Sequence, residues 1–230
     1  MIDHKLWSTW KLIKGLFANG GSFLEIGAGN RPKTPIKGSY FIDLSKKAVN
    51  NLKKRGGFAK TADASNIPYD DNMFDVVCAF EILEHVENDK KAFDEILRVL
   101  KTNGKFVLSV PLGMKYWSSW DELVGHIRRY EPGELKEILQ MIGFKIEKFL
   151  PTRSISVLQR YMWLGKIGTA IYKRVPKPFI FLEHHLVTKV VNLESRLGSI
   201  RGLCWETGEF ANIGENKTGA LLMCAKINKS

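Results

Sequence analysis

The sequence predicts an α/β protein with a mostly parallel β-sheet that helices cover on both faces. Two observations lead to this fold class. Short runs of bulky apolar residues, typical of strands, alternate along the chain with longer segments that repeat apolar residues every three or four positions. One run, "FDVVCAFEIL", is apolar at nearly every position, as in strands buried on both faces of a parallel sheet.

The expected elements alternate in order. Residues 2–17 predict an amphipathic helix, and strands are expected in "SFLEIGAG", "GSYFIDLS", "FAKTADASNIPY", "FDVVCAFEIL", "KFVLSVPL", "KIEKFLP" and "TGALLMCAKI". Helices are expected in "SKKAVNNLKKRGG", with Ser45 as N-cap, and in "NDKKAFDEILRVLKTNG", with Gly104 just past its end. A further helix is expected in "EPGELKEILQMIGF", with Pro132 near its start.

The length and composition fit one domain. The chain has 230 residues, of which 44% are hydrophobic and 26% charged, as in a globular protein with a real core. We expect a single domain over residues 1–230, with an N-terminal helix (1–19), a core (20–151), a basic helical insertion (152–212) and a final strand (213–230). Three widely spaced cysteines suggest neither a disulfide framework nor a zinc site, which makes a cytoplasmic location the expectation.

The net charge of +11 favours an anionic partner such as a nucleic acid, a membrane surface or a phosphorylated substrate, although it could simply aid solubility. From Lys145 to Arg201 there are eleven Lys or Arg against three acids, interleaved with aromatic residues. This pattern suits a peripheral helix on anionic lipid, an RNA-binding surface, or a helical cap over a pocket or in a homodimer interface.

The stretch "FLEIGAGNRP" reads as a buried strand that runs into a glycine turn. Gly27 and Gly29 are present, but Pro32 stands where the dinucleotide fingerprint has its third glycine, and it obstructs an immediate helix. No lysine–serine pair of the P-loop type follows. The turn therefore disfavours NAD and ATP and favours a nucleoside ligand without phosphate.

Carboxylates lie in or after three successive strands. Asp43 ends the second strand, where it can accept bonds from ribose hydroxyls, and Asp63 follows the third, where it can accept from an adenine amino group. Glu25 lies inside the first strand, where an acid is costly without a partner. Each could be a surface or capping carboxylate, but together they suit a ligand that carries a sulfonium and an ammonium group.

These motifs resemble those of the class I S-adenosylmethionine-dependent methyltransferases. "FLEIGAGN" and "YFIDLS" are similar to the first two motifs of the type 11 group, which contains quinone- and sterol-type enzymes. "TADASNIPYDDNMFDVVCAFEILEHVEN" and "EILRVLKTNGKFVLSVP" are similar to the motifs that follow. The resemblance implies a Rossmann-like, doubly wound, seven-stranded sheet with an antiparallel last strand, the cofactor S-adenosyl-L-methionine and the product S-adenosyl-L-homocysteine.

The resemblance also assigns cofactor contacts. Gly27 and Gly29 would approach the methionine part, Glu25 would organise that end, and Asp43 would hold the ribose. Asp63 and the backbone of Ala64 would read the adenine, and Phe80 and Glu81 would lie beside the amino-acid end. His85 would lie near the methyl-transfer space, which makes it a candidate catalytic residue. The predicted cofactor set is completed by Ala28, Asn30 and Leu44.

This sequence departs from the family pattern in the first motif. Asn30 replaces a glycine, and the connection from Gly29 to Asp43 is short and contains prolines, so the first helix is expected to be reduced or missing. Such "GNRP" loops are similar to those of methyltransferases associated with surface sugars and lipid-linked sugars.

Two segments could supply acceptor chemistry. In "EILEH", Glu81, Glu84 and His85 would share a helical face and could bind a divalent ion, although structural or cofactor-lid roles are an alternative. In "GHIRRYEPGEL", His126 could act as a base. The candidates to bind a substrate phosphate or carboxylate are Arg128, Arg129 and Tyr130.

Three functions compete. The leading one is methyl transfer to an oxygen or nitrogen of a small-molecule or lipid-linked acceptor. The second is RNA methylation through the basic insertion, and the third is non-enzymatic cofactor binding, because fold alone does not fix function.

Overall fold

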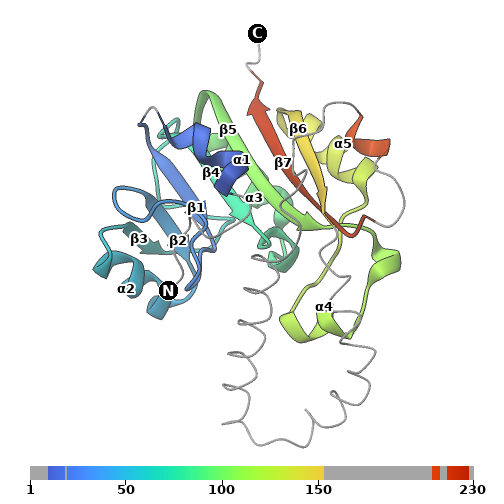
Figure 1. Cartoon of the computed structure of the whole chain (residues 1–230), viewed down its shortest axis with the longest axis horizontal. Helices are drawn as coiled ribbons and strands as arrows, with labels where there is room; N and C mark the ends of the chain where they lie inside the picture. Colours follow the sequence, from blue (N-terminus) through green and yellow to red (C-terminus); the bar gives the residue numbers. More distant parts are fainter. Residues whose placement is uncertain (1–9, 19, 153–208, 213–216, 228–230) are drawn as a thin grey trace, which may run out of the picture. The chain divides into compact units, whose positions relative to one another are not determined.

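The protein is described by a computed structural model for residues 10–18, 20–152, 209–212 and 217–227. These residues form a seven-stranded sheet in the order β3-β2-β1-β4-β5-β7-β6 (Figure 1). The strands are β1 (Phe23–Ile26), β2 (Tyr40–Asp43), β3 (Phe58–Thr61), β4 (Phe74–Phe80), β5 (Leu100–Pro111), β6 (Phe144–Thr152) and β7 (Gly219–Lys226).

The strand directions confirm the predicted fold class. The pairs β1–β2, β2–β3, β1–β4 and β4–β5 are parallel, whereas β7 is antiparallel to both β5 and β6. The chain winds outward from β1 to β3 and then returns to place β4 on the other side of β1. This reversal between β1 and β4 is the topological switch point, where ligands of open α/β sheets bind beyond the carboxyl ends of the strands.

Helices cover both faces of the sheet. Val77 and Ala79 of β4 pack into the cluster that contains the buried side chains of α3 and α5, while Val76 and Cys78 face the opposite cluster with α1 and η2. The helices, with their bounds, are α1 (Trp10–Ile13), η2 (Lys14–Phe17), α2 (Lys46–Lys54), η3 (Leu83–His85), α3 (Asp89–Val99), η4 (Met114–Tyr116), α4 (Ser119–Val124), α5 (Pro132–Ile142) and η6 (Phe210–Asn212).

Local sequence explains where several helices begin. The Ser45 hydroxyl accepts a hydrogen bond from the backbone N–H of Ala48, which confirms it as the N-cap of α2. The Asn88 side chain does the same for α3, and Pro132 occupies the first turn of α5 as expected.

The end of α3 was predicted wrongly. The helix stops at Val99, and β5 begins at Leu100 rather than after Gly104. Asn103 has a φ of +63°, and the pairing of β5 with β4 shifts its register between Phe74 and Val76. The "TNG" segment therefore forms an irregularity inside a long strand, and its glycine is not a helix cap.

Two other predictions concern segments that the structure describes only in part. Only residues 10–17 of the predicted N-terminal helix are described, and there they form α1 and η2. The basic insertion lies outside the described residues except at its two ends. No helix in the described part of the chain is long and apolar enough to cross a membrane.

Candidate functional site

The glycine turn that follows β1 has backbone conformations that favour glycine. Gly27 has a φ of +66° and Gly29 a φ of +55°. A Cβ atom on Gly27 would lie 2.4 Å from two side-chain atoms of Ile82, whereas one on Gly29 would meet nothing within 4 Å. The turn thus packs directly against the loop that follows β4.

Asp43 joins the glycine turn to the start of α2. Its Oδ2 accepts a hydrogen bond of 2.7 Å from the backbone N–H of Gly29, and its Oδ1 accepts one of 2.8 Å from Ser45. A carboxylate has about four acceptor positions, so two remain for donors such as ribose hydroxyls. The carboxylate is therefore held in one orientation before any ligand arrives.

Glu25 shapes the loop that replaces the first helix. Its side chain is buried, and it accepts hydrogen bonds from the backbone N–H groups of Lys33 and Thr34 and from the Thr34 hydroxyl. Burial raises the pKa of Glu25, although these hydrogen bonds oppose the rise. Residues 27–39 contain no helix, which confirms the expectation drawn from Pro32.

A pocket of about 350 Å³ opens at the carboxyl ends of β1, β2 and β3. Leu44 lines it and is 69% exposed, so its side chain is accessible to an aromatic ring. The pocket is lined by Ile26, Gly27, Ile42, Asp43, Leu44, Ala62, Asp63, Ala64, Ser65, Ile82, His85, Val86, Glu87 and Asn88.

The lining of this pocket fits a cationic nucleoside. Among the described residues that line it there is no lysine or arginine, whereas Asp43, Asp63 and Glu87 contribute carboxylates. Asp63 accepts hydrogen bonds from the backbone N–H and the hydroxyl of Ser65, both on Oδ1. A pyrophosphate would lack counter-charges here, while S-adenosylmethionine offers hydroxyl, amino and cationic groups that carboxylates attract.

The pocket contains some of the predicted cofactor residues and not others. Gly27, Asp43, Leu44, Asp63 and Ala64 line it. The remaining members of the predicted set do not, namely Glu25, Ala28, Gly29, Asn30, Phe80 and Glu81. Sequence reasoning missed most of residues 82–88, although their position just after a buried strand was a usable signal.

Phe80 and Glu81 lie at the end of β4. Glu81 has a φ of +52°, a conformation that is costly for a residue with a side chain, and its backbone N–H bonds to the carbonyl of Ser109. The Phe80 ring is buried and has the Lys33 ammonium 4.9 Å from its centroid. The contacts of Phe80 and Glu81 with the amino-acid end of the cofactor stay a prediction.

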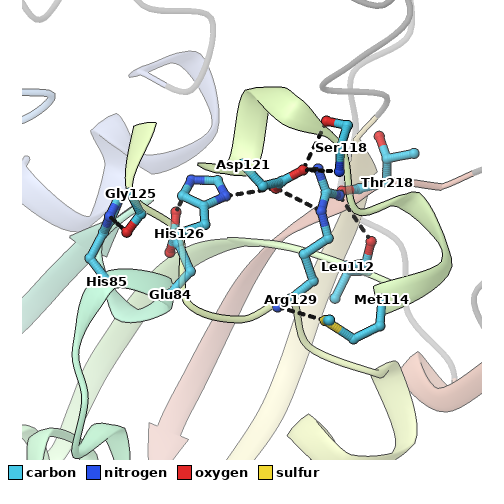
Figure 2. Close-up of polar contacts among 10 residues, drawn as sticks. All are labelled: Glu84, His85, Leu112, Met114, Ser118, Asp121, Gly125, His126, Arg129 and Thr218. Atoms are coloured by element: carbon cyan, nitrogen blue, oxygen red, sulfur yellow. Dashed lines mark hydrogen bonds and ion pairs between the residues drawn. The ribbon is translucent and has the colours of Figure 1, made fainter. Parts of the chain in front are cut away.

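His126, the predicted base, lies in a polar cluster beside this pocket. Its Nε2 is 3.6 Å from Oε1 of Glu84, and its ring centroid is 4.8 Å from that of His85. Figure 2 shows the imidazole of His126 between Glu84 and Asp121. Thus, two segments that are far apart in the sequence place His85 and His126, the two predicted catalytic residues, side by side.

Burial controls the charges in this cluster. The Glu84 side chain is fully buried, which raises its pKa well above the ordinary value, and the charge of Glu81 adds to the rise. Burial lowers the pKa of His85 in spite of the hydrogen bond between its Nδ1 and the carbonyl of Gly125. Both shifts favour neutral side chains.

Asp121 is the buried acid on the other side of His126. It accepts hydrogen bonds from Nε and Nη2 of Arg129 at 2.8 and 3.0 Å, and from the backbone N–H and hydroxyl of Ser118. Burial alone would raise the pKa of Asp121, but the bonds from Arg129, His126 and Ser118 outweigh it and hold the pKa low. Ser118 and Asp121 also cap α4, a helix that the sequence analysis did not predict.

The predicted substrate-binding residues have partners within the protein. Arg129 is only 5% exposed and is held by Asp121 and by the carbonyls of Leu112 and Thr218. Arg128 pairs with Asp89 at 2.6 Å, and the Tyr130 hydroxyl bonds to the same carboxylate. These contacts hold the 112–131 segment against η3 and α3, and a substrate role for the three residues stays a prediction.

Comparison with known proteins agrees with this geometry. The family described as "Methyltransferase domain" matches residues 24–108, which include the glycine turn, Asp43, Asp63 and β4. Residues 24–108 thus match a methyltransferase domain, and the fold is that of the class I S-adenosylmethionine-dependent methyltransferases. The cofactor of such domains is S-adenosylmethionine, and the pocket lies beyond the carboxyl ends of the strands, where open α/β sheets bind their ligands.

Curated relatives match part of the length of this chain. An uncharacterized protein of Methanocaldococcus jannaschii is 35% identical over 91 residues, which cover 39% of this chain and 44% of that protein. A tRNA (carboxymethyluridine(34)-5-O)-methyltransferase of Arabidopsis thaliana is 25% identical over 131 residues, which cover 54% of this chain and 31% of that protein. The chain thus spans less than half of the length of these curated relatives.

A solved structure shares the fold. It is described as a SAM-dependent methyltransferase, "possible histamine N-methyltransferase", from Thermotoga maritima. It has a TM-score of 0.61 and 17% sequence identity, and the match covers 98% of this chain and 91% of that one. At this identity, the similarity establishes the fold alone.

Proposed function

We propose that this protein transfers the methyl group of S-adenosylmethionine to an oxygen or nitrogen of a small-molecule or lipid-linked acceptor. The observation that carries the proposal is the pocket at the ends of β1, β2 and β3, with Gly27 at its floor and Asp43 fixed between the turn and α2. Asp43 would hold the ribose and Asp63 the adenine amino group.

The chain's own residues would do three things when the cofactor is bound. The glycine turn lets the backbone approach the ligand, and Asp43 and Asp63 orient it. His85, which lines the pocket, and His126, which lies beside it, would meet the acceptor group. The cofactor supplies an electrophilic methyl group, so the work left to the protein is to hold the acceptor in line and to take up its proton.

A small acceptor is favoured by the charge of the described site. A polyanionic substrate needs basic side chains to neutralise its phosphates, and the described lining of the adjoining cofactor pocket, which such a substrate would approach, carries carboxylates instead. The cytoplasm, with a peripheral position at a membrane for a lipid-linked acceptor, is the proposed location. A homodimer is a further expectation.

RNA methylation is the second candidate. It is supported by the net charge of +11, by the basic and aromatic residues of the insertion and by the tRNA methyltransferase among the relatives. A cofactor-binding protein without catalysis is the third.

The test is transfer of label from methyl-labelled S-adenosylmethionine to three sets of acceptors: phenols and amines, lipid-linked sugars, and unmodified tRNA. We expect S-adenosylhomocysteine to form with one of the first two sets, and its formation to be lost in Asp43→Ala. Labelled tRNA would instead select RNA methylation. Binding of the cofactor without turnover in any set would point to the third function.

A further inference from the structure

Three side chains with metal-ligating atoms converge next to the cofactor pocket. One such atom from each of Glu84, His85 and His126 lies within 4.8 Å of the other two. Glu84 and His85 belong to η3, which follows β4, and His126 follows α4 (Figure 2). The sequence had suggested Glu81 as the third ligand, but residues 81–85 are not α-helical, and the structure gathers His126 instead.

The carboxylate of Glu84 accepts no hydrogen bond in this cluster. Its side chain is fully buried, and neither Oε1 nor Oε2 has a hydrogen-bond partner in the described part of the chain. A buried polar group without a partner costs free energy, and native proteins almost always satisfy it with a hydrogen bond, a water or an ion. A bound cation would supply the partner that this carboxylate lacks.

The distance between Glu84 and His126 fits two ligands of one ion better than it fits a hydrogen bond. Nε2 of His126 and Oε1 of Glu84 are 3.6 Å apart, which is long for a hydrogen bond. Two ligands that each bind a tetrahedral zinc ion at about 2.1 Å lie roughly 3.4 Å from one another.

Both imidazoles are held by second contacts. Nδ1 of His126 donates to the carboxylate of Asp121 at 2.8 Å, and Nδ1 of His85 donates to the carbonyl of Gly125 at 2.9 Å. Because these acceptors require a protonated Nδ1, the lone pair of each ring lies on Nε2. Carboxylate and carbonyl contacts of this kind orient histidine ligands in metal sites, and Arg129 in turn fixes Asp121.

From these observations we infer that Glu84, His85 and His126 bind a divalent transition-metal ion of the zinc class. Two histidines and one glutamate leave a position open for an oxygen ligand. His85 also lines the cofactor pocket, so the open position would face the acceptor.

The consequence for the acceptor rests on the proposed function. The acceptor would be a hydroxyl compound whose oxygen binds the ion. Because His85 and His126 would then be ligands of the ion, the proton of the acceptor would pass to the solvent and not to either imidazole. An oxygen lone pair would then form the bond to the methyl carbon, while the electron pair of the sulfur–carbon bond returns to sulfur and S-adenosylhomocysteine leaves.

The test is titration of the chelator-stripped protein with Zn²⁺ and with Co²⁺. Binding of each ion is measured by calorimetry, and binding of Co²⁺ is also measured by its visible absorption. We expect one ion per chain and the intense absorption of a four-coordinate site. Glu84→Gln and His126→Gln should each weaken binding at least 100-fold. Asp121→Asn should weaken it by about 10- to 100-fold, because it removes only the contact that orients His126.

The matched control is Glu122→Gln, which changes an exposed acid next to Asp121 and should leave metal binding unchanged. Equal binding by the wild type, Glu84→Gln and Glu122→Gln would overturn the inference, as would the absence of stoichiometric binding. S-adenosylmethionine is titrated into the same metal-free samples. Cofactor binding without metal binding would overturn this inference alone, whereas metal binding without cofactor binding would overturn the proposed function alone.

Discussion

The carboxylate of Asp121 lies between the imidazole of His126 and the guanidinium of Arg129, and His126 donates its Nδ1–H to it at 2.8 Å. All three side chains come from α4 and the loop that follows it, and His126 lies 3.6 Å from the fully buried Glu84 of η3. This contact orients His126, which lies beside both Glu84 and His85. The loop is thereby tied to the edge of the cofactor pocket.

Removal of Asp121 should destabilise the protein strongly. Asp121→Ala would leave the buried guanidinium of Arg129 without its carboxylate, and breaking a buried ion pair in this way costs about 3–5 kcal/mol. The free energy of unfolding is measured by urea denaturation. The exposed neighbour provides the control, since Glu122→Ala should change this free energy by no more than about 0.5 kcal/mol. Equal midpoints for the two variants would show that the contact does not hold the loop.

Substitution of Gly27 should weaken cofactor binding more than substitution of Gly29. Both positions have positive φ, so alanine at either should cost about 1–2 kcal/mol of stability. Only at Gly27 would the added Cβ displace Ile82, a residue of the pocket wall. We expect the affinity for S-adenosylmethionine to fall about tenfold further in Gly27→Ala, from the roughly 1 kcal/mol cost of a displaced rotamer. Equal affinities of the two variants, measured by calorimetry, would contradict this view of the turn.

Protonation of Glu95 should contribute to acid unfolding. Two hydrogen bonds from Arg98 lower the pKa of Glu95 below its ordinary value of 4.5, and the same guanidinium bonds to the carbonyls of Ile67 and Tyr69 in the loop beside the pocket. Because the pKa is lower in the folded protein, the stabilisation is fully present above pH 4.5 and is lost as the pH falls through the folded value.

Glu95→Gln should therefore flatten part of the dependence of unfolding free energy on pH in this acidic window. Substitution of the exposed Asp94 by Asn serves as the control, and it should keep the slope of the wild type. Unfolding is followed by urea denaturation at several pH values below 6. A slope in Glu95→Gln that equals that of the wild type would rule out this contribution.

Local sequence patterns were sufficient to predict most of the strands and helices. The strands were predictable because runs of β-branched and apolar residues such as "FDVVCAF" indicate burial. The starts of α2 and α5 were predictable because serine is a common N-cap and proline is common in the first turn of a helix, as Ser45 and Pro132 show. The end of α3 was predicted wrongly from Gly104, because glycine is common both after the end of a helix and at an irregularity within a strand. Only the register of β4 against β5 distinguishes the two.

The pocket was predictable in part for a similar reason. Asp43 and Asp63 follow strands, and topology brings the ends of parallel strands together. The cluster around His126 was not predictable, because Glu84 and His126 are separated by the strand β5, by the helices α3, η4 and α4, and by loops. Their approach depends on how Arg128 and Tyr130 fasten the 112–131 segment to Asp89. No local periodicity encodes such a contact.

The most direct measurement is calorimetric titration of the wild type and Asp43→Ala with S-adenosylmethionine, S-adenosylhomocysteine and NAD. Asp70→Ala is the control, since this exposed acid lies outside the cofactor pocket. The account predicts micromolar binding of the first two ligands, none of NAD, a loss of at least tenfold in Asp43→Ala and no change in Asp70→Ala. Folded wild-type protein that binds neither S-adenosyl compound, or that binds them equally well without Asp43, would contradict it.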